Sequence, residues 1–134
     1  MPGVVSVVSS LVSTSRSTSA SGAAMKPTRQ FGTRIVEDDT YAHLAPAHLP
    51  RLAALDALEC TVYISGFSKI LVPNWRVGFM AAPLALVDRL VDTKLLTTLT
   101  TPGITEQALA YCLEQGLLRR HTERVMQQIG RAHV

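Results

Sequence analysis

The chain has 134 residues, of which 47% are hydrophobic, and a formal net charge of +3. This length suits a single domain, and the apolar share is large enough for a buried core. The sequence has no basic cluster and no apolar run as long as a membrane span, so we expect neither nucleic-acid binding by this segment nor membrane insertion. Cys60 and Cys112 lack metal-ligand spacing, which predicts buried free thiols, no metal site and a cytoplasmic protein.

Residues 1–33 differ in composition from the rest of the chain. Ser, Thr, Val and Ala dominate residues 6–21, and the first acidic residue is Glu37. The first positive charge is Arg16 and serines interrupt the apolar run, which argues against a signal peptide, and Arg is sparse for a transit peptide. We expect a Ser-rich tail that is either disordered or non-native, such as an out-of-frame translation of GC-rich DNA.

Residues 128–134 read QIGRAHV and resemble the conceptual translation of a common sequencing-adapter oligonucleotide. Our hypothesis is that natural coding ends near Gln127 and that residues 128–134 are a non-native tail. The alternative is an ordinary helix terminus in which Gly130 is the C-cap. The codons for these residues distinguish the two interpretations.

The middle of the chain, residues 34–127, carries an ordered pattern of strands followed by helices. Apolar runs rich in β-branched and aromatic residues predict strands at 34–37, 60–65 and 75–82. A loop is expected at 38–46, after the first strand, and Gly66 breaks the second. This order indicates an α/β domain.

Three helices are predicted after the last strand. The first begins at Pro83 and ends before Pro102, and the others occupy residues 105–115, ended by Gly116, and 117–127. The first helix repeats apolar residues at helical spacing, so we expect one buried face formed by Leu84, Val87, Val91 and Leu95. The second has its apolar side at Ala108, Leu109, Cys112 and Leu113.

Charged side chains lie at the ends of the predicted strands. Asp38 and Asp39 follow the first strand, Lys69 follows the second, and Arg76 begins the third. Ligands of open α/β sheets bind outside the carboxyl ends of the strands. A third strand running antiparallel would bring Arg76 to the same edge, where an acid, a lysine and an arginine could meet one ligand.

Two motifs carry a family resemblance. Residues 66–78 read GFSKILVPNWRVG and resemble the cofactor-lysine segment of class I/II aminotransferases, which use pyridoxal 5'-phosphate (PLP). Residues 37–41 read EDDTY and resemble the Asp-x-x-Tyr motif of that family. The likeness is closest to aminoadipate/kynurenine-type aminotransferases and to the effector domains of MocR-type regulators. It implies a partial, incomplete three-layer PLP-transferase large domain over residues 34–127.

The resemblance implies a role for each site residue. Lys69 would bind the cofactor aldehyde as a Schiff base and then act as the base that moves the substrate proton. Asp38 would pair with the pyridine nitrogen, with Asp39 as its competitor. Tyr41 would hydrogen-bond the phenolic oxygen, and Arg76 would clamp the phosphate.

Ser65 and Ser68 are further candidates for contact with the cofactor phosphate. The family usually has Ser or Thr three residues before the lysine, where this chain has Gly66, with Ser65 one step earlier. Either Ser65 compensates through a shifted turn, or the contact is lost. His121 is expected to be a helix-surface residue.

The resemblance implies a transferase that moves an amino group between an amino acid and a 2-oxo acid, built as a homodimer when complete. The phosphate-cradling turn and the arginine that grips the substrate carboxylate have no counterpart in residues 1–134. We therefore expect little or no transaminase activity from this chain by itself. The alternative is a fragment of the effector-binding domain of a MocR/GntR-type transcription regulator, in which a winged helix lies upstream.

Overall fold

A computed structural model describes residues 33–45 and 49–131 of the chain. The predictions for residues 1–32 and 132–134 therefore lie outside the described residues, and the domain boundaries at 34 and 127 stay predictions. The described elements are β1 (Ile35–Asp38), the 3-10 turn η1 (Ala42–Leu44), α2 (Leu52–Asp56), β2 (Thr61–Gly66), the 3-10 turn η2 (Pro73–Trp75), β3 (Gly78–Ala81), α3 (Leu84–Thr97), α4 (Gly103–Glu114) and α5 (Leu117–Arg131).

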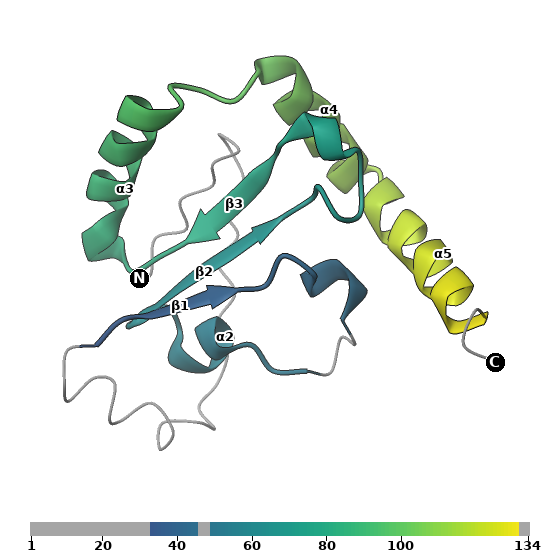
Figure 1. Cartoon of the computed structure of the whole chain (residues 1–134), viewed down its shortest axis with the longest axis horizontal. Helices are drawn as coiled ribbons and strands as arrows, with labels where there is room; N and C mark the ends of the chain where they lie inside the picture. Colours follow the sequence, from purple (N-terminus) through teal and green to yellow (C-terminus); the bar gives the residue numbers. More distant parts are fainter. Residues whose placement is uncertain (1–32, 46–48, 132–134) are drawn as a thin grey trace.

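The strands form one mixed sheet in the order β1-β2-β3 (Figure 1). β1 runs parallel to β2, and β2 runs antiparallel to β3. The third strand thus runs antiparallel, which is the condition for Arg76 to reach this edge, and its first residue, Gly78, pairs with the last residue of β2, Gly66. The carboxyl ends of β1 and β2 and the beginning of β3 consequently share one edge of the sheet.

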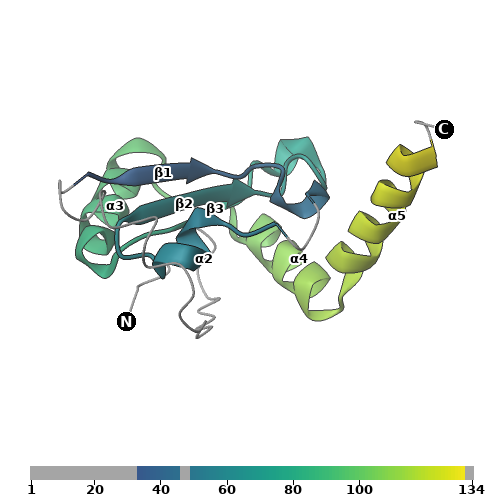
Figure 2. The same cartoon turned by 90° about the horizontal axis from the view of Figure 1, so that it is seen from below.

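The hydrophobic core lies next to this end of the sheet. Its buried members come from the turn after β2, from the entry to β3 and from two helices: Phe67, Ile70, Val77, Leu109 and Leu118. The last two belong to α4 and α5, which join at an angle through Gly116, a residue with a φ of 63° (Figure 2). The prediction that Gly116 ends a helix is confirmed, since glycine adopts this left-handed conformation without steric strain.

The structure differs from the sequence analysis at three places: the start of the third strand, a helix that was not predicted, and the alternative that made Gly130 a helix cap. β3 begins at Gly78 rather than at residue 75, because Pro73 opens the turn η2 and Arg76 closes it with a φ of 51°. α2 was not predicted, and the carboxylate of Glu37 accepts the backbone N–H groups of its first residues, Leu52 and Ala53, at 3.0 and 2.8 Å. Gly130 lies within α5 and does not cap it.

The predicted buried face of α3 is also wrong for the described part of the chain. α3 contains no buried residue, and Leu84, Val91 and Leu95 are all exposed. The helix stands at the opposite end of the sheet from α4 and α5 (Figures 1 and 2). The apolar spacing gave the helix correctly, but no described element packs over its face to bury it.

Candidate functional site

A tight turn after β2 presents Lys69. Its flanking residues Phe67 and Ile70 are 7% and 4% exposed, so both are anchored in the core. The carbonyl of Phe67 accepts the N–H groups of Ile70 and Leu71 at 3.1 and 2.7 Å, and the N–H of Phe67 donates to the carbonyl of Val77 at 3.1 Å. Lys69 itself is exposed. The backbone of the lysine is therefore fixed while its amine remains accessible.

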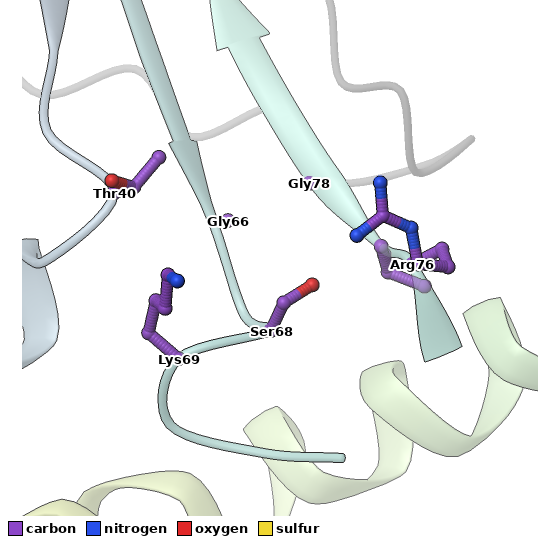
Figure 3. Close-up of a pocket in the computed structure, with 7 residues that line it drawn as sticks. Thr40, Gly66, Ser68, Lys69, Arg76 and Gly78 are labelled. Carbon is purple, nitrogen blue, oxygen red and sulfur yellow. The ribbon is translucent and has the colours of Figure 1, made fainter. Parts of the chain in front are cut away.

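A pocket of about 300 Å³ opens beside this turn (Figure 3). It is lined by residues from three segments, Thr40, Gly66, Ser68, Lys69, Arg76, Val77 and Gly78. Figure 3 shows the Lys69 amine on the side toward Thr40 and the Ser68 hydroxyl on the side toward Arg76. Three predicted site residues, Ser68, Lys69 and Arg76, thus line one cavity.

Arg76 reaches the pocket from a strained backbone position. Its φ of 51° and ψ of 35° are left-handed, a region that non-glycine residues rarely occupy. The preceding turn and the following residue hold it there, because its N–H donates to the carbonyl of Pro73 at 3.3 Å and Val77 is only 4% exposed. Such strain persists where the surrounding structure imposes it, often at functional sites.

Two glycines form one wall of the pocket. Gly66 and Gly78 are directly opposite each other in the β2–β3 pair. A Cβ atom at Gly78 would lie 2.9 Å from the carbonyl oxygen of Ser65, which is closer than real side chains come, whereas one at Gly66 would lie 3.4 Å from that of Val77. The absence of side chains at both positions leaves room beside Lys69.

Tyr41 lies next to the lysine. The Lys69 Nζ atom is 5.5 Å from the centroid of the Tyr41 ring, a cation–π geometry. Tyr41 immediately precedes η1 and is 58% exposed. The structure therefore joins the Asp-x-x-Tyr segment to the lysine turn, as their placement at two neighbouring strand ends predicts.

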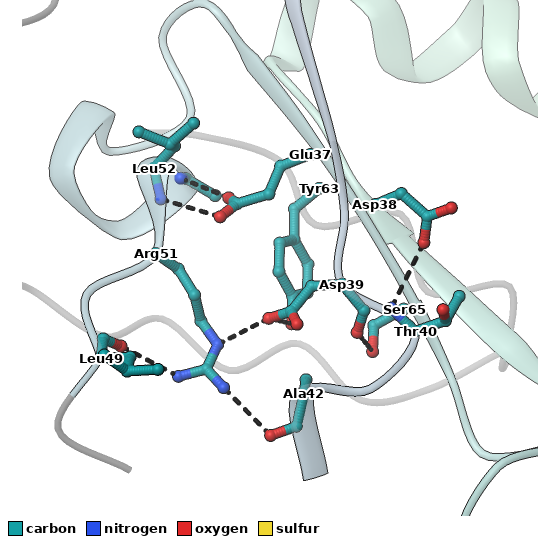
Figure 4. Close-up of polar contacts among 11 residues, drawn as sticks. Glu37, Asp38, Asp39, Thr40, Ala42, Leu49, Arg51, Leu52, Tyr63 and Ser65 are labelled. Carbon is teal, nitrogen blue, oxygen red and sulfur yellow. Dashed lines mark hydrogen bonds and ion pairs between the residues drawn. The ribbon is translucent and has the colours of Figure 1, made fainter. Parts of the chain in front are cut away.

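The two adjacent acids have different surroundings (Figure 4). Asp39 accepts from Arg51 Nε at 2.8 Å and from the Tyr63 hydroxyl at 3.0 Å. Asp38 is exposed, accepts the Thr40 N–H at 3.3 Å, and points away from Arg51 in Figure 4. Asp39 is thus held in an ion pair, while the carboxylate of Asp38 remains open to a ligand.

The network around Asp39 shifts the proton affinities of its partners. Burial is the main cause that raises the pKa of the Tyr63 hydroxyl. The hydrogen bond to Asp39 is the main cause that raises the pKa of Arg51. Both groups therefore keep their protons at neutral pH and continue to donate to Asp39. Sequence reasoning assigned no role to Arg51 or Tyr63, because their contact with Asp39 joins separate segments of the chain.

Ser65 is placed differently from Ser68. It is 3% exposed, and its hydroxyl donates to the carbonyl of Asp39 at 2.8 Å, which ties β2 to the chain after β1. Ser65 is absent from the residues that line the pocket. Its suggested phosphate contact stays a prediction, whereas Ser68 is positioned within the cavity. Thr40 also lines the cavity, although the sequence motif drew attention only to its neighbours.

Within residues 33–45 and 49–131, no group of His, Cys, Asp or Glu side chains could hold a metal ion. No helix in the same segments is both long and apolar enough to cross a membrane. Cys60 and Cys112 are free and half-buried. The chemistry available in the pocket is that of a primary amine, a guanidinium and a hydroxyl, with a carboxylate and a phenol nearby.

Comparison with known proteins identifies the family of the chain. A family model described as aminotransferase class I and II matches residues 23–134. The chain is 36% identical over 95 residues to the 2-aminoadipate transaminase of Thermus thermophilus, covering 66% of this chain and 24% of that protein. It is 35% identical over 89 residues to the uncharacterized HTH-type transcriptional regulator YisV of Bacillus subtilis, covering 65% of this chain and 18% of that protein.

Solved structures agree on the fold. The α-aminoadipate aminotransferase LysN from Thermus thermophilus, complexed with N-(5'-phosphopyridoxyl)-L-leucine, matches with a TM-score of 0.69 and 30% identity, over 78% of this chain and 28% of that one. A multiple substrate aminotransferase from Thermococcus profundus matches with a TM-score of 0.68 and 27% identity, over 78% and 26%. The predicted fold class and family resemblance are confirmed, over about a quarter of these structures.

Proposed function

From the premise that the chain belongs to the class I and II aminotransferase family, we propose that its pocket binds pyridoxal 5'-phosphate through Lys69. The observation that carries this proposal is the convergence of Lys69, Ser68 and Arg76 on one cavity of about 300 Å³. When bound, PLP supplies an electron sink for reactions at the α-carbon of an amino acid.

The pocket suits a molecule that carries an aldehyde and a phosphate. The Lys69 amine is accessible and its backbone is anchored, as an aldehyde-binding nucleophile requires. The Arg76 guanidinium and the Ser68 hydroxyl line the side of the cavity away from Thr40 and the Lys69 amine. There they can donate to phosphate oxygens. Gly66 and Gly78 line the cavity without side chains, which would let a flat ring approach the backbone.

We assign the other polar positions by their surroundings. Asp38 takes the pyridine nitrogen, because Asp39 is held by Arg51 and Tyr63. Tyr41 takes the phenolic oxygen, because its ring already lies beside the Lys69 amine. When its amine is free, Lys69 would serve as the base that moves the α-proton of an amino-acid substrate. We assign Ser65 no contact with the cofactor, because its hydroxyl donates to the carbonyl of Asp39, just after β1.

The reaction proposed for the whole protein is transfer of an amino group between an amino acid and a 2-oxo acid. The chain spans 18% to 24% of the length of the curated relatives described above. The substrates, a homodimeric assembly and a cytoplasmic location therefore belong to this proposal. The match to a 2-aminoadipate transaminase favours an amino acid substrate with an acidic side chain as the first to test.

A second candidate is the effector domain of a MocR-type transcription regulator. It is favoured by the relatives, because several of them are uncharacterized HTH-type transcriptional regulators of Bacillus subtilis, at 30% to 35% identity. In this case the same cofactor site would sense an amino compound. Sequencing the DNA upstream of the chain separates the two functions: a coding region for a winged helix and linker favours the regulator.

The cofactor assignment is tested by incubating the chain with PLP, reducing with borohydride and mapping the labelled peptide. We expect the label on Lys69, and its loss in a Lys69→Ala variant. Lys94 on α3 lies outside the pocket and provides the matched control, Lys94→Ala, which should keep the label. A label found on Lys94 and not on Lys69 would overturn the assignment.

A further inference from the structure

The turn η1 carries a histidine that packs directly against the lysine turn. The ring of His43 stacks on that of Phe67, with centroids 5.2 Å apart and an angle of 27° between the planes. The Nε2 atom of His43 is buried, and it has no hydrogen-bond partner within the described part of the chain. A buried polar atom without a partner lowers stability.

This stack runs beside the contact between Tyr41 and Lys69. Tyr41 and His43 lie two positions apart on one segment, and Phe67 and Lys69 lie two positions apart on the other. Between the segments, the Lys69 amine lies 5.5 Å from the centroid of the Tyr41 ring, and the His43 and Phe67 ring centroids lie 5.2 Å apart. Two contacts thus fix how the segment after β1 sits against the segment after β2.

Phe67 is the residue through which this contact can reach the lysine. Its carbonyl accepts the N–H groups of Ile70 and Leu71, and these two bonds form the turn that holds Lys69. A side chain that fixes the Phe67 ring therefore restrains the turn. The ring also contacts Phe79 on β3, with centroids 5.9 Å apart, so His43 and Phe79 hold Phe67 from two elements.

Charged groups surround His43 from several elements. Asp39 and Arg51 act on it from the loop after β1 and from the residue before α2. Arg119 and Glu123 of α5 line a second cavity of about 300 Å³ together with His43, and they pair with each other at 3.1 Å. Burial and the charge of Arg51 lower the pKa of His43, against the opposing effect of Asp39, so the ring is neutral at neutral pH.

We propose that His43 is a positioning residue, whose ring stacks on Phe67 and thereby holds the lysine turn so that the Lys69 amine stays beside Tyr41. This inference rests on the proposed function for the importance of Lys69, but its structural content is independent of PLP. His43 touches neither cofactor nor substrate in this assignment. It acts through Phe67 and the two backbone hydrogen bonds of the turn.

The test compares His43→Ala, which removes the stack, with His43→Phe, which keeps an aromatic ring. The first readout is amide hydrogen exchange without PLP at Ile70 and Leu71, with Leu109 in the α4 core as the reference for global opening. We expect His43→Ala to speed exchange of Ile70 and Leu71 relative to Leu109 by about two- to tenfold, the range that loss of one aromatic pair gives. His43→Phe should restore wild-type values.

The second readout is the PLP concentration that gives half-maximal borohydride labelling of Lys69. We expect it to rise in His43→Ala by a similar factor, about two- to tenfold, and to return toward wild type in His43→Phe. The control is His121→Ala, because His121 is exposed on α5. Absence of labelling in the wild type would reject the proposed function while the exchange readout still tests His43.

The inference is overturned if Ile70 and Leu71 exchange as in the wild type after His43→Ala. It is equally overturned if they change only in step with Leu109, because that result indicates a general loss of stability and no specific hold on the turn.

Discussion

Gly78 lies directly opposite Gly66, and its backbone is so close to β2 that a Cβ atom would be 2.9 Å from the carbonyl oxygen of Ser65. At this wall of the pocket the two strands therefore approach each other too closely to leave room for a side chain at position 78. Because the obstacle is backbone, it cannot rotate away. The requirement for glycine at the two positions is unequal, since a Cβ atom at Gly66 meets only ordinary contacts, the nearest at 3.4 Å.

We expect Gly78→Ala to lower the free energy of unfolding by about 1–3 kcal/mol, the usual effect of forcing extra atoms into a packed site. Urea unfolding monitored by the fluorescence of Trp75, which packs against the core, measures this change. Gly103→Ala is the control, because no atom lies within 4 Å of a Cβ there. Equal stability of the Gly78 and Gly103 variants would contradict the close approach.

Gly66→Ser should fold and should bind PLP more tightly than the wild type. The added Cβ fits, and Gly66 lines the same cavity as Ser68 and Arg76, so we expect the added hydroxyl to enter that cavity. One hydrogen bond to a charged group is worth about 1.5–3 kcal/mol, which corresponds to about ten- to a hundredfold in affinity. Gly66→Ala, which adds the carbon without the hydroxyl, should show no gain. Tighter binding by the alanine variant would show that packing and not the hydroxyl is responsible.

Arg76→Gly should separate stability from cofactor binding. Glycine relieves the left-handed backbone, whose strain is about 1–2 kcal/mol, so the variant should be as stable as the wild type or more so. Loss of the guanidinium should weaken PLP binding by about tenfold or more. Leu99→Gly relieves a similar φ of 57° at an exposed position outside the pocket and should leave PLP binding unchanged. Unaltered PLP binding by Arg76→Gly would remove Arg76 from the site.

The adjacent acids should respond differently to the same change. Asp39→Asn weakens the ion pair with Arg51, which is part-buried, and we expect about 1–2 kcal/mol of lost stability. Asp38→Asn should leave stability within about 0.5 kcal/mol, since Asp38 is exposed, yet it should reduce PLP binding. Urea unfolding and PLP titration of both variants measure the two effects. The reverse pattern would make Asp39 the cofactor ligand.

Stability should depend on pH through His43. Its pKa is lowered from 6.5 in the folded protein, chiefly by burial, so the unfolded chain binds this proton more readily. Above pH 6.5, His43 should therefore leave the free energy of unfolding unchanged. As the pH falls below 6.5 toward the lowered pKa of the folded protein, the free energy of unfolding should decrease. Urea unfolding across this range should show a weaker dependence in His43→Phe than in His121→Phe. Parallel curves for the wild type and His43→Phe would contradict the assignment.

Much of the site could be predicted from the sequence, because its motifs are local. The two motifs place reactive groups at or near the ends of strands that β-branched residues specify: Asp38 and Tyr41 at β1, Lys69 after β2 and Arg76 before β3. Side-chain type and local spacing together indicated the family and the convergence on one sheet edge. Helix positions after β3 followed from apolar periodicity and from Pro83, Pro102 and Gly116 in the same way.

The tertiary structure decided which groups meet across the chain. The Asp-x-x-Tyr spacing favoured Asp38 over Asp39, but the sequence did not show what Asp39 does instead. The structure shows that Asp39 accepts from Arg51 and from the Tyr63 hydroxyl. Periodicity predicted a buried face for α3, but burial needs a partner, and no described element provides one. The sequence pattern indicates which side chains favour burial or hydrogen bonding. Which partners they find depends on packing between segments that are distant in the sequence.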